Sequence, residues 1–171
     1  MSYFKIILKN FTGFQHDKII YSLMVSVMLI KTLFILFSII ITMIDIKTGE
    51  VPRVVFITAF LFFIFLKALV LEKALVNEGI PLFESFIGFF EGLLVFLQAR
   101  IVSGKKLGLA DVWYSALTGL VLGPKWWYAA IGAACFTGII YILAVKRREI
   151  PFITFMALGS TVMSFIQGWR L

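Results

Sequence analysis

Long apolar runs follow one another along this chain, and only short polar stretches separate them. A segment that crosses a lipid bilayer as a helix needs about 20 mostly apolar residues. Six runs approach that length, and we expect each of them to form a membrane-spanning helix. They cover approximately residues 19–44, 54–71, 81–102, 107–123, 125–145 and 151–168. The sequence therefore predicts an all-α polytopic membrane protein with about six transmembrane helices.

The composition excludes a water-soluble enzyme. Hydrophobic residues make up 61% of the 171 residues and charged residues only 15%, whereas soluble domains are roughly half apolar and a quarter charged. The mean hydropathy of +1.04 leaves too little polar surface to enclose a core in water. We expect one membrane domain over residues 19–171. Residues 1–18 mix aromatic and aliphatic side chains with lysines, so an N-terminal amphipathic or interfacial segment is expected there.

The distribution of lysine and arginine predicts the orientation in the membrane, because these residues are enriched in cytoplasmic loops. The first, third and fifth loops contain eight of them, whereas the second and fourth loops and the C-terminus contain three. The odd-numbered loops are therefore expected in the cytoplasm and the C-terminus outside. With six spans, Lys5, Lys9 and Lys18 also lie outside. The count of lysine and arginine residues is then eight on the cytoplasmic side against six outside.

Several kinds of site are disfavoured. Cys135 is the one cysteine and His16 the one histidine, so an internal disulfide is excluded and a cysteine- or histidine-rich metal site is not expected. The net charge of +7 is spread between apolar runs and not over a solvated surface, which argues against nucleic acid as a partner. We expect the lipid bilayer as a partner, and no metal or other cofactor.

Two carboxylates stand at helix ends on the same expected membrane face. Asp45 ends the first apolar run and Asp111 opens the fourth, both on the cytoplasmic side. A single acid at a helix end is commonly a cap or a solvated charge, but two close acids can share one proton. The ionised acid then takes a proton from water while the protonated acid polarises a carbonyl, which is aspartyl hydrolysis. The small residues Gly108 and Ala110 would let a peptide backbone approach Asp111 closely.

Other ionisable residues are expected at membrane depth, where they are costly. Lys31 and Lys67 have long stems that can carry the ammonium groups toward an interface. Glu84 and Glu91 are seven residues apart and share a helix face. The sequence leaves open whether these acids pair with the lysines or contact a substrate.

Three segments carry a resemblance to a known family. They are Asp45 with Pro52 seven residues later, Gly108-Leu109-Ala110-Asp111, and Ile150-Pro151-Phe152 leading to Ala157-Leu158-Gly159. In this order, the segments resemble those of the type IV prepilin peptidases, which are GxGD intramembrane aspartyl proteases. The likeness covers roughly residues 30–165.

The resemblance implies an aspartic endopeptidase with Asp45 and Asp111 as the catalytic acids and with Gly108 and Ala110 in the active-site backbone. It implies removal of the basic leader from prepilin, pseudopilin or archaellin precursors at the cytoplasmic face of a prokaryotic cytoplasmic membrane. One cysteine and the short length resemble the peptidase-only members, without the methyltransferase domain and its paired Cys-x-x-Cys motifs.

Some residues depart from the family pattern. Ala110 replaces the second glycine of GxGD, and Arg53 stands where the family often has asparagine. Trp113 and Tyr114 stand where it often has Lys-Leu. Because alanine restricts positive φ, we expect either a different active-site backbone at Ala110 or a divergent or weakened member of the family.

Three other interpretations remain open from the sequence. A non-enzymatic six-helix protein, such as the substrate-binding subunit of an energy-coupling-factor transporter, would need a polar pocket that opens outside. A presenilin-type protease would have Pro-Ala-Leu where this chain has Met156-Ala157-Leu158. A purely structural membrane protein would need neither acid.

Overall fold

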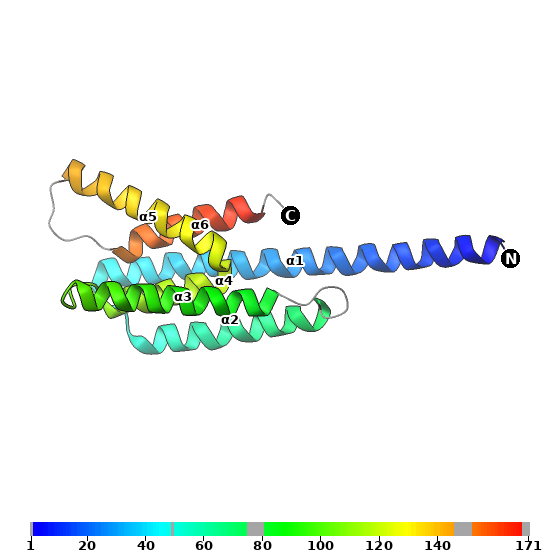
Figure 1. The fold of residues 1–171 in the computed structure, drawn as a ribbon, viewed down its shortest axis with the longest axis horizontal. Helices are drawn as coiled ribbons and strands as arrows, with labels where there is room; N and C mark the ends of the chain where they lie inside the picture. The colour runs from blue at the N-terminus through cyan, green and yellow to red at the C-terminus, as the bar shows by residue number, and fades with distance from the viewer. Residues whose placement is uncertain (1, 49, 75–80, 146–151, 169–171) are drawn as a thin grey trace.

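The computed structural model describes residues 2–48, 50–74, 81–145 and 152–168 (Figure 1). Within these ranges the regular structure is helical, and no strand is present. The helices are α1 (Ser2–Thr48), α2 (Arg53–Ala74), α3 (Pro81–Val102), α4 (Leu109–Leu122), α5 (Pro124–Val145) and α6 (Phe152–Gly168). The predicted fold class, an all-α protein with six long apolar segments, is confirmed over these residues.

The helices differ in their fitness to cross a bilayer. Three stretches of the described chain are long and apolar enough by length and composition: Val25–Thr48, Phe83–Val102 and Pro124–Val145. Leu109–Leu122 and Phe152–Gln167 are apolar but shorter. Large apolar side chains are exposed around the bundle, such as Phe65 at 60% and Leu143 at 74%. Such a surface is suited to lipid tails and not to water.

α1 is much longer than the first apolar run. Its 47 residues span about 70 Å at 1.5 Å per residue, and its N-terminal part projects beyond the other helices (Figure 1). The boundary predicted between residues 18 and 19 falls inside this continuous helix. The role of residues 1–18 stays a prediction.

α4 is the central helix of the bundle. It packs most extensively along α3 and also contacts the four other helices. From Asp111 to Leu122 its side chains are buried, with the exception of the half-buried Trp113. Its 14 residues measure about 21 Å, less than the hydrocarbon thickness of a bilayer. A helix that is apolar on all sides is stable when other helices surround it, which is the case here.

Glycines permit the close crossing of α3 and α4. A Cβ atom built on Gly119 would lie 2.5 Å from the carbonyl carbon of Gly88, and one built on Gly92 would lie 2.5 Å from the carbonyl oxygen of Ser115. Small residues at such crossings let helix backbones approach in membranes, where close packing replaces the hydrophobic effect as the driving force.

Lys67 donates hydrogen bonds to carbonyl groups at the C-terminal end of α4, inside the bundle. Its Nζ donates hydrogen bonds to the carbonyl oxygens of Leu120 at 2.6 Å and Val121 at 3.2 Å, and to Ser85 Oγ at 2.5 Å. The last carbonyls of a helix have no partner within the helix, and an unsatisfied carbonyl is costly away from water. Lys67 therefore binds inside the bundle and does not extend to an interface, contrary to the snorkelling interpretation.

The second lysine at membrane depth has a different environment. Lys31 is 7% exposed, and its Nζ has no hydrogen-bond partner within the described part of the chain. Lys31 and Glu84 both lie close enough to act electrostatically on Lys67, the first by repulsion and the second by attraction.

Candidate active site

The C-terminal ends of α1, α3 and α5 lie toward the same end of the bundle (Figure 1). This end therefore contains the C-terminus of α1, with Asp45, and the N-terminus of α4, with Asp111. The two acids come from segments 66 positions apart in the sequence, and helix direction alone places them on one side. Which membrane face this end occupies stays a prediction.

Asp111 lies in the first turn of α4 and is 8% exposed. Its Oδ2 accepts a hydrogen bond from the backbone N–H of Gly108 at 3.0 Å. Gly108 is the N-cap residue and has an extended backbone, with φ −62° and ψ 146°. The carboxylate thus satisfies one of the free N–H groups at the helix start, where the helix dipole also favours a negative charge.

The two small residues before Asp111 have different roles. A Cβ atom on Gly108 would lie 3.0 Å from Asp111 Oδ2, so glycine provides room for the carboxylate itself. Ala110 is a half-buried helical residue that packs against the core. Positive φ occurs within the described ranges at Gly104, Lys105 and Gly123. Ala110 is helical, and a helical φ is accessible to alanine. Whether the backbone there differs from that of the family stays a prediction.

Asp45 is half-buried in the last turns of α1. Three residues later, Thr48 Oγ1 lies 2.8 Å from the carbonyl oxygen of Ile44 and 2.7 Å from that of Glu50. This side chain closes the end of α1 and directs the chain toward α2, which begins directly after Pro52. The spacing from Asp45 to Pro52 thus reflects the last turn of one helix and the short connection to the next.

Asp45 lies close enough to Asp111 to act on it electrostatically, by repulsion between the two carboxyl groups. Arg100, in the last turn of α3, also acts electrostatically on Asp111, by attraction. Its Nη1 donates a hydrogen bond to the carbonyl oxygen of Leu107, next to the N-cap of α4. From the sequence, Arg100 was one of the eight positive residues that predicted the orientation, and no other role was expected for it. Its position, eight residues before the N-cap glycine, was the signal available for a role beside Asp111.

The connection between α3 and α4 is held by its own hydrogen bonds. The backbone N–H of Lys105 donates to the carbonyl oxygen of Arg100 at 2.8 Å, and Ser103 Oγ lies 3.1 Å from that oxygen. Gly104 and Lys105 have φ values of 63° and 68°. These left-handed residues end α3 and reverse the chain, so Gly108 and Asp111 are positioned by a short, internally bonded turn.

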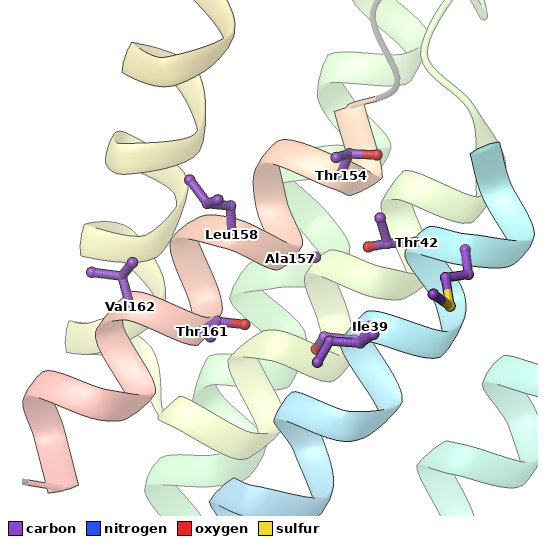
Figure 2. Close-up of a pocket in the computed structure, with 9 residues that line it drawn as sticks. Ile39, Thr42, Thr154, Ala157, Leu158, Thr161 and Val162 are labelled. Carbon is purple, nitrogen blue, oxygen red and sulfur yellow. The ribbon is translucent and has the colours of Figure 1, made fainter.

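A groove lies between α1 and α6 (Figure 2). Its volume is about 330 Å³, and it is lined by Ser38, Ile39, Thr42, Met43, Thr154, Ala157, Leu158, Thr161 and Val162. Thr42 precedes Asp45 by three residues and therefore shares its side of α1. The hydroxyl oxygens of Thr42 and Thr154 are buried and have no hydrogen-bond partner among the residues described. No substrate-binding residue was predicted from the sequence, so the residues of this groove are candidates that only the structure provides.

The structure describes only part of the third segment that carries the resemblance, residues 150–159. Residues 150 and 151 lie outside the described ranges, and α6 begins at Phe152. Ala157 is 6% exposed and forms part of the floor of the groove. A Cβ atom on Gly159 would lie 3.2 Å from the backbone nitrogen of Ala134, so this glycine allows α6 to pack closely against α5.

Metal ligands do not cluster in the described chain: no group of three or more histidine, cysteine, aspartate or glutamate residues there could hold an ion. Cys135 is exposed on α5, and the side chain of His16 lies outside what the structure describes.

Comparison with known proteins gives one match. The sequence model of the type IV leader peptidase family matches residues 32–143, a stretch that contains Asp45 and Asp111 and extends from α1 to α5. No curated protein and no solved structure matches the chain.

Proposed function

The chain belongs to the type IV leader peptidase family, and from this membership we propose that it is an aspartic endopeptidase that uses Asp45 and Asp111. The observation that carries the proposal is that two carboxyl groups from different helices lie at one end of the bundle, where Asp45 acts electrostatically on Asp111. The family supports a protease, and the pair of acids supports its aspartic type.

The proposed reaction follows from one proton shared by the two acids. The ionised carboxylate takes a proton from a water molecule as the water oxygen attacks the carbonyl carbon of the scissile peptide. The protonated acid gives its proton to the carbonyl oxygen as the C=O π electrons move onto it. As the diol collapses, one hydroxyl group returns its proton to the acid that is now ionised and its oxygen reforms the C=O π bond. The C–N bond breaks at the same time, and the leaving amine takes from the other acid the proton that came from water. The Gly108 hydrogen bond engages Oδ2 of Asp111, so we assign Oδ1 to the water.

The proposed substrates are prepilin, pseudopilin or archaellin precursors, each with a basic leader before an apolar segment. We propose cleavage at the cytoplasmic face of a prokaryotic cytoplasmic membrane. Lys47, Arg53, Lys105 and Lys106 support this orientation, because all four flank the end that bears the two acids and positive residues are enriched on the cytoplasmic side.

We assign the groove of Figure 2 to the apolar segment of the substrate. Helices associate in membranes through small residues and hydroxyl groups, and Ala157, Thr154 and Thr161 supply these on the α6 side. The groove reaches α1 within one turn of Asp45, so a helix lying in it would present its end to the acids. The free hydroxyl groups of Thr42 and Thr154 could then find partners.

The experiment is a leader-cleavage assay in membranes with a prepilin-like precursor. Asp45→Asn and Asp111→Asn should each abolish cleavage, with a loss of at least about 1,000-fold expected when one of two cooperating catalytic acids is removed. Glu50→Gln is the matched control, because Glu50 is an exposed acid near the same end and its loss should leave the rate unchanged. Near wild-type cleavage by either aspartate variant would remove that residue from catalysis.

The family match does not favour the non-enzymatic alternative, a substrate-binding subunit of an energy-coupling-factor transporter. That function would require a polar pocket, whereas the groove between α1 and α6 has mainly apolar walls, formed by Ile39, Met43, Leu158 and Val162.

A further inference from the structure

A buried cluster of three hydroxyl groups joins three helices one turn from Asp111. Tyr114 Oη, on α4, donates a hydrogen bond to Ser38 Oγ, on α1, at 2.7 Å. Ser160 Oγ, on α6, lies 3.1 Å from the same Oη. All three residues are fully buried. A hydrogen-bonded polar cluster in an apolar surrounding fixes one arrangement of the groups that form it.

The cluster shares helix faces with the two acids. Tyr114 follows Asp111 by three residues on α4, and Ser38 precedes Asp45 by seven residues, or two turns, on α1. Residues at these spacings lie on the same side of a helix. The hydrogen bond between Tyr114 and Ser38 therefore connects the two faces that carry the acids.

We propose that Tyr114 is a positioning residue, which through Ser38 and Ser160 holds α1 and α4 in the register that brings Asp45 to Asp111. The proposal rests on the proposed function. Two acids that share a proton must keep their separation closely, and a shift of about 1 Å can cost about 100-fold in rate. α1 packs mainly against α6 and α2 and has few contacts with α4, so a direct hydrogen bond between α1 and α4 has a large share in setting their register.

The hydroxyl group of Tyr114 can be removed while its neighbours keep their other contacts. Its ring is stacked on Phe34 with a centroid distance of 6.3 Å, a contact that phenylalanine would keep. Ser38 Oγ lies 2.8 Å from the carbonyl oxygen of Phe34, and Ser160 Oγ lies 3.1 Å from that of Ala157, so both serines retain an acceptor without the tyrosine hydroxyl. Tyr114→Phe should therefore preserve folding and release the link between helices.

The matched control is Ser115→Ala. Ser115 is the next residue of α4, equally buried, and its Oγ accepts a hydrogen bond from Trp127 Nε1 on α5 at 3.0 Å. Its loss also removes one buried bond between helices, but that bond joins α4 to a helix without a proposed catalytic acid. A general loss of stability would affect both variants, whereas loss of register should affect only Tyr114→Phe.

Two readouts test the proposal on purified, folded protein. The first is leader cleavage, in which Tyr114→Phe should lower kcat about 10-fold or more with KM within about twofold of wild type, and Ser115→Ala should leave both unchanged. The second is thiol cross-linking between Asp45→Cys and Asp111→Cys in a Cys135→Ser background, with a short bifunctional reagent. Adding Tyr114→Phe should slow this cross-linking severalfold, and adding Ser115→Ala should not. Ser38→Ala should also slow the cross-linking, as Tyr114→Phe does.

The outcomes separate this inference from the proposed function. Cross-linking needs no activity, so it tests register even if wild-type protein cleaves no leader peptide, a result that would refute the proposed function alone. Unchanged cross-linking in Tyr114→Phe would overturn the positioning role, whatever happens to kcat. Equal slowing of cross-linking by Ser115→Ala would also overturn it, because the effect would then be general to α4.

Discussion

Replacing Gly119 by alanine should push α3 and α4 apart. The new Cβ would lie 2.5 Å from the carbonyl carbon of Gly88, whereas ordinary contacts of this kind begin near 3.4 Å. The carbonyl oxygen of Gly88 would lie closer still, so the two helices must separate by at least 0.9 Å. This separation must come from backbone movement, because the atoms opposite Gly119 belong to the backbone of α3 and not to a flexible side chain.

The cost follows from the size of that movement. Introducing an atom into a packed interface typically costs about 1–3 kcal/mol. Separation at Gly119 would also weaken the neighbouring close contact between Gly92 and Ser115. Since Asp111 lies on the same helix, a shift of α4 by nearly 1 Å should reduce kcat by about 10- to 100-fold.

The matched control is Gly132→Ala on α5, where an added Cβ meets no atom within 4 Å. Alanine is favoured over glycine inside a helix by about 0.5–1 kcal/mol, so this variant should be as stable as wild type or more stable, and equally active. Thermal unfolding in detergent and leader cleavage per folded protein would be measured for both variants. If Gly119→Ala matched Gly132→Ala in both assays, the close crossing of α3 and α4 would be refuted.

Three further predictions concern α4 and the groove. Lys67→Met should lower the free energy of unfolding by about 1–3 kcal/mol, because the Leu120 carbonyl loses its partner, whereas Lys125→Met, at an exposed lysine, should change it little in the same thermal unfolding assay. Thr42→Val should raise KM for the precursor severalfold without loss of stability, because the hydroxyl has no partner within the described chain and gains one only with substrate. Ala110→Gly should lower stability by up to about 1 kcal/mol, because Ala110 is helical, and leave cleavage per folded protein unchanged or higher.

Each of these predictions has a contrary result. Equal stability of Lys67→Met and Lys125→Met would show that the ammonium group is not needed at the end of α4. An unchanged KM in Thr42→Val would remove this hydroxyl from substrate binding. A loss of cleavage per folded protein in Ala110→Gly would mean that the methyl group of Ala110 takes part in the site.

The sequence predicted the helices and the pairing of the acids for the same reason. Backbone polar groups must be satisfied within a bilayer, so long apolar runs become helices, and the direction of the chain reverses from one run to the next. Asp45 ends the first run and Asp111 opens the fourth. The alternation alone therefore places them at one end of the bundle, where the ends of α1 and α4 lie in the structure. Their pairing in catalysis stays a prediction.

The sequence could not predict how the helices are rotated and which one is central. α5 is apolar on all sides, so no polar face indicates its orientation, and the polar residues of α4 do not show which neighbouring helices they contact. The Gly88–Gly119 crossing and the hydrogen bonds from Lys67 to the α4 carbonyl groups join residues more than 30 positions apart.

Ala110 and Tyr114 are two further residues whose roles the sequence could not predict. From the sequence, Ala110 was a departure with a backbone restriction and Tyr114 was a departure without a role. The structure makes Ala110 an ordinary helical residue and gives Tyr114 partners on α1 and α6. Periodicity and spacing describe each helix by itself, whereas these properties depend on which atoms of other helices lie opposite, and only packing in three dimensions decides that.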